Sequence, residues 1–426
     1  MVAFLFISFV LLMLVGLDVA YSMVFASFLG IIGKATRPVD LTLIPLTMVS
    51  GADSFQLVAI PLYILTGELM NRGGVTQRLV EFSLSLIGHF KGSLSHVSVV
   101  TNMIMAGVSG AAVADAAATG AVLIPAMKKD GYGAEYACAV IASAAVIGPI
   151  IPPSIPMVVY GVLANQSVAK LFMAGMVPGV IMGIGFMIVC AIVAKRRNYP
   201  SRQRATWRDR LIATGRAGWS LMLPVIIIGG IVFGIMTCTE AAAVAVVYAL
   251  IIGLFIHRDL KFNDMIKGIY EAGITSGIIM ILLAAAGIFG WLLAEAKVDA
   301  VIVEFMLSIT NDPMGMLLLV NLLLLIIGCF LEPLPAMIIF FPALSALGIK
   351  IGIDPIHLGL VMVLNLMIGM LTPPVGFLLF IVSAIGDVRM GPLVREVFPF
   401  LIITLLVLLA CTLYPPLATW MPSLIH

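Results

Sequence analysis

Long apolar runs, separated by short polar segments, follow one another along almost the whole chain. Most runs are long enough for a helix to cross the hydrocarbon core of a bilayer, which takes about 20 residues. We predict membrane-spanning helices near residues 1–17, 18–33, 53–70, 170–194, 219–236, 240–256, 265–294 and 397–420. Because such runs recur without a polar domain between them, the predicted fold class is an all-α polytopic membrane protein.

Three other segments are too polar to cross the membrane. Segment 34–52 carries enough polar residues that we expect it outside the bilayer or at its interface. Segments 75–91 and 298–309 mix charged with apolar residues, as amphipathic helices at a membrane surface do.

Four further apolar stretches are interrupted. Stretches 134–164 and 355–385 contain the proline pairs Pro152-Pro153 and Pro373-Pro374. Stretches of about 92–127 and 314–347 turn in their middle, and each arm has about 16 residues, too few to span. Lipid cannot satisfy the backbone groups freed at a break, so breaks survive only inside protein or beside water. We therefore predict two discontinuous transmembrane helices and two re-entrant helical hairpins.

These interruptions recur at one spacing. The two proline pairs are 221 positions apart, and so are Gly107 and Gly328, and Gly148 and Gly369. Matches in the same order on the same predicted elements indicate an internal repeat. The repeats are predicted to cover residues 1–194 and 219–426. Because each contains an odd number of crossings, the two should have inverted topology.

The segment between the repeats, 195–218, is the densest basic stretch of the chain. By the positive-inside rule it is predicted to be a cytoplasmic linker, and binding of nucleic acid is not expected. The whole chain is 62% hydrophobic and 10% charged, whereas soluble domains have about 25% charged residues. Composition thus makes the lipid bilayer the expected solvent.

The first predicted cation site joins a hairpin turn to a helix break. It comprises Gly107 and Ser109 of the turn and Gly148, Pro149 and Pro152 of the break. Unpaired carbonyls at a break can supply the five or so oxygens that a sodium ion needs. Glycine lets the backbone approach an ion closely.

The second predicted cation site is the counterpart in the second half. It joins Gly328 at the hairpin turn to Gly369 and Thr372 at the break, where Thr372 adds a hydroxyl oxygen. Half-helices that start near Ala111, Pro333, Pro153 and Pro374 can direct their N-termini at an anion. An anionic solute is therefore predicted beside the cations.

Two acids lie near these sites. Asp115 lies in the apolar pattern, where ionisable residues are costly; it could hold the hairpin tip, lie near the ion or contact the solute. Glu332 begins the return arm of the second hairpin and could bind an ion, contact a solute or simply start the helix. The candidate substrate residues are Glu332, Pro153, Pro374 and Asp115.

No enzyme is predicted. The sequence lacks a His-Glu-x-x-His motif, a phosphate-binding Walker loop and a G-x-S-x-G motif. An ion channel is the main alternative, but charged rings that would line a pore are not evident. A secondary transporter is therefore favoured.

Several motifs resemble those of one family. They are Gly51–Phe55, the run SGAAVAD at 109–115, IIPPSIP at 150–156, LPVIIIGG at 223–230 and TEAAAV at 239–244. The chain resembles the large membrane subunit of tripartite ATP-independent periplasmic (TRAP) transporters over nearly its whole length. The resemblance implies a sodium-driven importer of an organic anion, such as a dicarboxylate, a sugar acid or sialic acid, that works by an elevator motion.

The resemblance also implies location and partners. The chain is expected in the bacterial inner membrane, with a separate small four-helix membrane subunit and a periplasmic substrate-binding protein. One departure concerns the second hairpin tip: many members have an acidic residue followed by small polar residues, whereas this chain has Glu332-Pro333-Leu334-Pro335. An anion transporter that works without a binding protein is the alternative within this class.

Overall fold

A computed structural model describes residues 2–33, 41–297, 304, 306–310 and 312–424. Within these ranges the chain is helical and has no β-strand, which confirms the predicted all-α class. The helices of the first half are α1 (Val2–Leu14), α2 (Val19–Gly33), α3 (Leu43–Ala52), α4 (Ala59–Arg72), α5 (Val75–Ile87), α6 (Ser93–Ser109), α7 (Ala112–Lys129), α8 (Ala134–Ala145), α9 (Ile155–Leu163) and α10 (Val168–Arg197). Those of the second half are α11 (Trp207–Val232), α12 (Cys238–Ile251), α13 (Phe262–Glu295), α15 (Pro313–Gly328), α16 (Pro333–Ile351), α17 (Pro355–Gly369), α18 (Phe377–Gly386), α19 (Met390–Leu413) and α20 (Pro416–Thr419).

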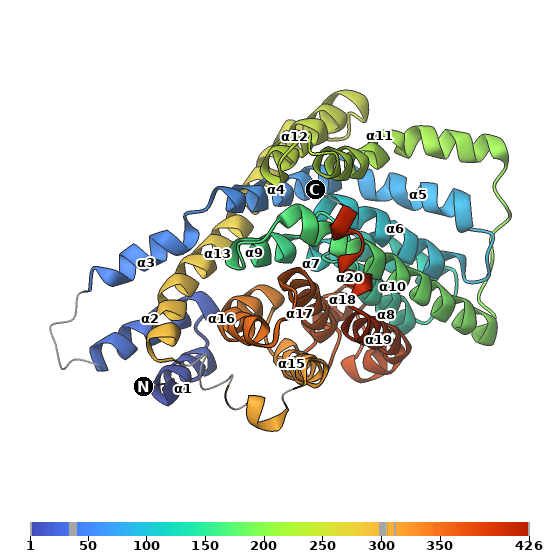
Figure 1. The fold of residues 1–426 in the computed structure, drawn as a ribbon. Coiled ribbons are helices and arrows are strands. Elements are labelled where there is room, and N and C mark those ends of the chain that lie inside the picture. Colours follow the sequence, from blue (N-terminus) through green and yellow to red (C-terminus); the bar gives the residue numbers. More distant parts are fainter. Residues whose placement is uncertain (1, 34–40, 298–303, 305, 311, 425–426) are drawn as a thin grey trace.

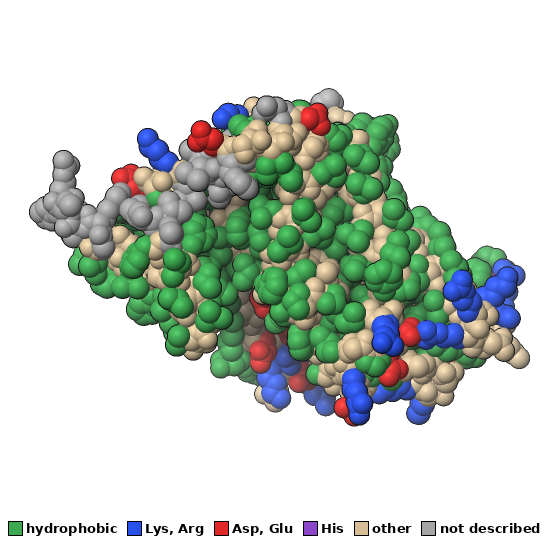
Figure 2. All heavy atoms as spheres, turned by 90° about the horizontal axis from the view of Figure 1, so that it is seen from below, with side chains coloured by type: hydrophobic (Ala, Val, Ile, Leu, Met, Phe, Trp, Pro, Cys, Tyr) green, Lys and Arg blue, Asp and Glu red, His purple; other side chains and the backbone are tan. Residues whose placement is uncertain are grey.

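Six helices in the described residues are long and apolar enough to cross a membrane, or seven if the bent pair α3 and α4 forms one span. Hydrophobic side chains cover the middle of the face in Figure 2, while Lys and Arg side chains lie around its margins, most of them at the right and along the lower edge. A belt of exposed apolar side chains would be costly in water and is stable against lipid. The molecule is therefore a multi-pass membrane protein.

One group of helices lies around the long helix α13. Helices α2, α3 and α4 pack on α13, and α12 packs on α4 (Figure 1). Backbones of α3 and α13 approach closely, since a Cβ on Gly287 would lie 2.4 Å from the carbonyl oxygen of Thr47. Residues 43–52 of the segment predicted to lie outside the bilayer or at its interface thus form the helix α3, which packs along α13.

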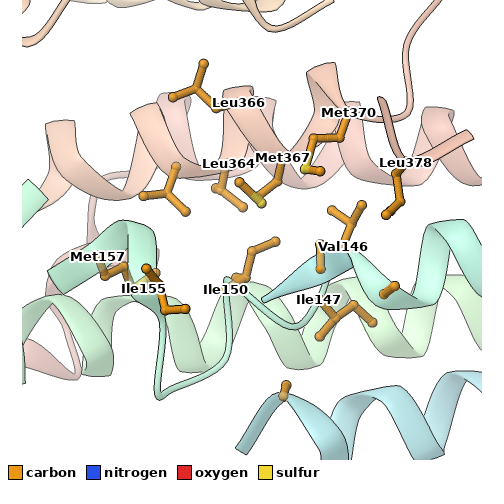
Figure 3. Packing of buried hydrophobic residues seen from close by; sticks show 14 of the residues in the cluster. Val146, Ile147, Ile150, Ile155, Met157, Leu364, Leu366, Met367, Met370 and Leu378 are labelled. Carbon is orange, nitrogen blue, oxygen red and sulfur yellow. The ribbon is translucent and has the colours of Figure 1, made fainter. Parts of the chain in front are cut away.

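A second group contains the hairpins and broken helices. Helices α6 and α7 form a hairpin that packs on α8, and α15 and α16 flank α17. The breaks separate α8 from α9 and α17 from α18. Figure 3 shows Ile150 of the first break and Ile155 at the start of α9 on the side of Leu364 and Met367 of α17. The two broken helices thus share one apolar core.

The basic segment between the halves is less open than its sequence suggests. Helix α10 continues to Arg197 and α11 begins at Trp207, so the non-helical connection is shorter than 195–218. Thr206 and Asp209 form a reciprocal capping box that starts α11. The predicted amphipathic segment 298–309 lies largely outside the described residues.

Candidate functional site

The tip of the first hairpin is in direct contact with the first helix break. Gly110 ends α6 with a φ of +63°, and a Cβ there would lie 2.3 Å from the carbonyl oxygen of Pro153. The amide of Ile155 donates to the carbonyl of Gly110 at 3.4 Å. Ser154 caps α9 by accepting a hydrogen bond from the amide of Met157. Only glycine fits this turn, because both the positive φ and the close contact exclude a side chain.

Asp115 lies beneath this tip and is fully buried. The hydroxyl of Ser109 donates to its Oδ1 atom, and the hydroxyl of Thr119 donates to its backbone carbonyl at 2.6 Å. Its Oδ2 atom has no hydrogen-bond partner among the described residues and lies 2.4 Å from where a Cβ of Gly148 would be. Buried polar atoms almost always have a partner, so this oxygen is a candidate acceptor for a proton or a cation.

The other residues of the predicted first cation site are more dispersed. Gly107 faces α11, where a Cβ would lie 2.6 Å from the ring of Pro224. The carbonyl of Pro149 accepts a hydrogen bond from the hydroxyl of Ser154. Pro152 is buried and precedes a cis peptide bond. The structure thus brings Ser109, Asp115 and Gly148 together.

The second hairpin also meets its helix break through glycines. A Cβ on Gly369 would lie 2.4 Å from the carbonyl carbon of Gly328. The amide of Thr372 donates to the carbonyl of Gly369 at 3.0 Å, while its hydroxyl donates to the carbonyl of Ile368 at 2.8 Å. The three residues of the second predicted cation site, Gly328, Gly369 and Thr372, therefore lie at one junction.

A buried amide network lies one turn below this junction. Asn365 donates to the Oδ1 atom of Asn321 at 2.8 Å, and Asn321 donates to the hydroxyl of Thr412 at 2.8 Å. The Oδ1 atom of Asn365 is buried and has no partner among the described residues. Each half thus keeps one unpaired oxygen acceptor near its hairpin junction.

A cavity of about 550 Å³ lies between the two hairpin tips. It is bounded by both tips, the first break, α4, α13, α17 and α18. Its lining residues are Ile64, Gly67, Glu68, Ser109, Gly110, Ala111, Ala112, Val113, Ala114, Ala117, Pro149, Ile155, Pro156, Thr275, Ile278, Ile279, Glu332, Pro333, Leu334, Met367, Met370 and Phe377. A concave site with few polar groups is typical of a pocket for a small molecule.

The predicted substrate residues occupy different positions around this cavity. Glu332 is exposed on its wall, whereas Asp115 is buried behind the first tip. Pro153 is not a lining residue and contacts Gly110 through its carbonyl. Pro374 lines a separate surface cleft near Arg395. Of the four, Glu332 alone lines the cavity.

The sequence did not indicate that α4 and α13 form one wall of the cavity. Glu68 lines the cavity and forms an ion pair with Arg72 at 3.2 Å, one helical turn later. The i, i+4 pairing of opposite charges at Glu68 and Arg72 was a signal readable from the sequence. Thr275 and Ile278 of α13 have no comparable local signal, because only tertiary packing brings them to the site.

A cation here would rest on few side chains. Across the parts of the chain that the structure describes, no three His, Cys, Asp or Glu side chains form a metal-binding group. Sodium differs from transition metals in accepting carbonyl and hydroxyl oxygens, as hard cations do. Backbone carbonyls and the unpaired oxygens at the two junctions are therefore the available ligands.

The fold is that of known membrane transporters. The structure resembles the Alcanivorax borkumensis YdaH transporter with a TM-score of 0.64, covering 94% of this chain and 98% of that one at 12% identity. It resembles Neisseria gonorrhoeae MtrF, described as one of a class of antimetabolite efflux pumps, with a TM-score of 0.61 at 12% identity, covering 92% of each chain. At this identity the likeness concerns the fold.

The sequence comparison narrows the class to a family. Residues 6–417 match the model of the DctM component of the tripartite ATP-independent periplasmic transporter, and the chain belongs to this family. It is 37% identical to the sialic acid TRAP transporter large permease protein SiaM of Vibrio cholerae, covering 97% of this chain and 96% of that one. This membership confirms the predicted family and a transporter subunit rather than an enzyme.

Other relatives carry different substrate names. The chain is 38% identical to the C4-dicarboxylate large permease DctM of Vibrio cholerae, covering 100% of this chain and 98% of that one. It is 39% identical to the isethionate permease DctMQ of Oleidesulfovibrio alaskensis, covering 96% of this chain and 65% of that one. Relatives of similar identity thus bear the names of chemically different organic acids.

Proposed function

We propose that this chain is the large membrane subunit of a sodium-coupled secondary importer of a small organic acid. The observation that carries the proposal is the pair of hairpin–break junctions that border one central cavity. In transporters, interrupted helices place backbone oxygens and helix ends where ions and solutes bind. The sialic acid, dicarboxylate and isethionate names of its relatives support an organic acid as the solute.

Sodium binding is supported by the junctions themselves. The first site would use Ser109, Asp115 and carbonyls around Gly148, and the second would use Thr372 and carbonyls around Gly328 and Gly369. A buried carboxylate oxygen without a partner is costly unless a cation or a proton compensates it. An ion at the first site would remove that cost and would also tie the hairpin tip to the break.

Movement of the site is supported by the arrangement of the two helix groups. The second half runs hairpin, broken helix and long helix in the order of the first half, as expected for inverted repeats. The cavity has one wall from α4 and α13, and its other walls come from the hairpins and broken helices. In an elevator motion, the hairpins and broken helices would move together past α4 and α13.

The proposed assembly follows from the family. We expect a small four-helix membrane subunit and a periplasmic substrate-binding protein as partners, in the bacterial inner membrane. The basic segment 195–218 would face the cytoplasm, as the positive-inside rule requires.

The test is uptake by the reconstituted complex. The chain, its small membrane partner and the binding protein are assembled in proteoliposomes that contain no internal sodium. We expect solute uptake with an inward sodium gradient and none with an equal inward potassium gradient. Equal uptake under the two gradients would contradict sodium coupling.

A further inference from the structure

Three buried polar side chains join three helices just below the second junction. Asn321 of α15, Asn365 of α17 and Thr412 of α19 have exposed fractions between 0% and 6%. Asn365 donates to Asn321, and Asn321 donates to Thr412, each at 2.8 Å. Polar side chains among membrane helices are costly and usually have a specific task. The task of this amide network is not explained by the cavity, whose lining includes none of its three members.

Backbone carbonyls fix the direction of every bond in the network. The Nδ2 atom of Asn365 also donates to the carbonyl of Val361 at 2.7 Å, and a carbonyl can only accept. Asn365 therefore turns its NH₂ group to the Oδ1 atom of Asn321, which leaves the NH₂ group of Asn321 for Thr412. The hydroxyl of Thr412 donates in turn to the carbonyl of Leu408 at 2.8 Å. The network thus has one orientation, which sets how α15 faces α17 and α19.

The repeated architecture does not require polar residues at these places. On the 221-residue spacing of the two halves, the equivalent residues of the first half are Val100, Ala144 and Ala191. The same order of hairpin, broken helix and long helix is therefore built there with apolar residues. Asn365 also keeps a buried Oδ1 atom without a partner among the described residues, which costs free energy. Stability of the fold therefore does not account for the network.

The two junctions are tied together in different ways. At the first, the amide of Ile155 bonds to the carbonyl of Gly110 and so joins the break to the hairpin tip. At the second, no hydrogen bond joins tip residues 328–332 to break residues 370–376 in the part of the chain that the structure describes. The contact there is between Gly328 and Gly369. Because neither glycine has a side chain, this contact alone does not fix how α15 is turned about its axis.

The amide network lies where it can supply that restraint. Asn365 precedes Gly369 by one helical turn, and Asn321 precedes Gly328 by two, so each amide shares a helix face with its glycine. A Cβ on Gly328 would lie 3.7 Å from the backbone oxygen of Asn365. The bond between the two amides therefore fixes which face α15 turns to α17, and with it the place of the carbonyls at the junction.

We propose that Asn321, Asn365 and Thr412 are positioning residues for the second cation site. They hold α15 against α17 and α19 so that the carbonyls around Gly328 and Gly369 can bind one ion together. Loss of the network lowers the sodium affinity of this junction and leaves the first junction unchanged. This inference rests on the proposed function, because it takes the second junction as a sodium site.

The main test replaces the whole network by apolar residues of similar shape. Asn321→Leu, Asn365→Leu and Thr412→Val are combined, because removing both partners of a buried hydrogen bond can be nearly neutral for stability. Uptake by proteoliposomes with the small membrane subunit and the binding protein is titrated with sodium. We expect the sodium concentration for half-maximal uptake to rise about tenfold or more, as for other residues that orient metal ligands. The melting temperature in choline should change little.

A milder pair of variants separates hydrogen bonding from shape. Thr412→Val removes the acceptor of Asn321 with little change of volume and should raise the sodium requirement, whereas Thr412→Ser keeps the hydroxyl and should behave as the unmodified chain. Thr404→Val is the matched control, because Thr404 is a buried hydroxyl of the same helix that bonds to Leu401 within α19. An equal rise in Thr404→Val and Thr412→Val would contradict the positioning role. If the triple variant does not fold, this pair decides by the same titration.

A density map gives a readout that a general loss of stability would not produce. The triple variant is compared with the unmodified complex at the sodium concentration that half-saturates uptake by the latter. We expect the sodium peak at the second junction to disappear, while the peak near Ser109 and Asp115 remains. Equal peaks at the second junction, or an unchanged sodium requirement in a folded triple variant, would overturn the proposal.

The outcome is separable from that of the proposed function. Sodium-independent uptake by the unmodified complex would reject the sodium sites themselves, whatever the variants do. Sodium-dependent uptake by the unmodified complex, with the same sodium requirement in the folded variants, would keep the importer and reject the role of the amide network.

Discussion

The two hairpin–break junctions share an architecture but differ in burial. Every residue of the first break, 146–154, is buried, and its hairpin tip ends against the carbonyl of Pro153. At the second junction Pro373 and Pro374 are exposed, and the tip presents Phe330 and Glu332 to the outside of the fold or to the cavity. One arrangement of helices thus gives a closed junction in the first half and a more open one in the second, and the closed junction is the better candidate for a tight ion site.

The largest effect should come from filling the first tip. Gly110→Ala should abolish uptake, because its Cβ would meet the carbonyl oxygen of Pro153 as well as the strain of a positive φ. Gly352→Ala is the matched control, since Gly352 has a φ of +77° but no atom near its Cβ position. The Gly352→Ala substitution loses only the roughly 1–2 kcal/mol that a left-handed backbone costs a residue with a Cβ. Uptake by proteoliposomes checks both, and similar losses would mean that the tip contact is unimportant.

A slightly smaller effect is expected at the second junction. Gly369→Ala places a methyl group against the backbone of Gly328 and should separate α15 from α17, with loss of most uptake and a lower melting temperature. Gly277→Ala, on an open face of α13, should lose little of either. If Gly369→Ala were tolerated as well as the control, close approach of the two helices would not be required.

Removal of the hydroxyl at each junction should weaken sodium dependence, more at the first junction than at the second. Ser109→Ala removes the hydrogen bond to the buried carboxylate of Asp115 and should raise the sodium concentration for half-maximal uptake by about tenfold or more. Thr372→Ala should raise it less, because that hydroxyl already donates to the carbonyl of Ile368 in the preceding helix α17. Sodium titrations of uptake rank the two variants, and the reverse order would place the tighter site at the second junction.

The smallest effect belongs to the basic connection. Arg204 is exposed in the non-helical segment between α10 and α11, so Arg204→Ala should leave the sodium dependence unchanged. Arg202, two residues earlier, forms an exposed ion pair with Asp130. Removing that pair should lower the free energy of unfolding by about 0–1 kcal/mol, which would appear only as a small fall in melting temperature. An effect of Arg204→Ala as large as that of Thr372→Ala would reject the map of the sites.

Much of the fold was readable from the sequence because its signals are local. Apolar runs marked the long helices, and the pairs Pro152-Pro153 and Pro373-Pro374 fall within the helix breaks. What could not be read depends on contacts between distant segments. The packing of α3 on α13 requires the close approach at Gly287, and Thr275 reaches the cavity through the packing of α13 on α4 and α16.

The candidate site shows the same limit. Ser109, Gly148 and Glu332 could be proposed because turns and breaks are visible as glycine and proline in apolar runs. Pro333 at the start of α16 was also visible, but its place on the same cavity as the start of α7 was not. The sequence alone does not show which segments face each other across a cavity.

We propose that both hairpin–break junctions bind sodium. The most direct measurement is a density map of the purified complex in saturating sodium, compared with one in choline. The account predicts a sodium-dependent peak at each junction, one within ligand distance of Ser109 and Asp115 and one at the carbonyls around Gly328 and Gly369. Identical density at both junctions in the two maps would contradict it.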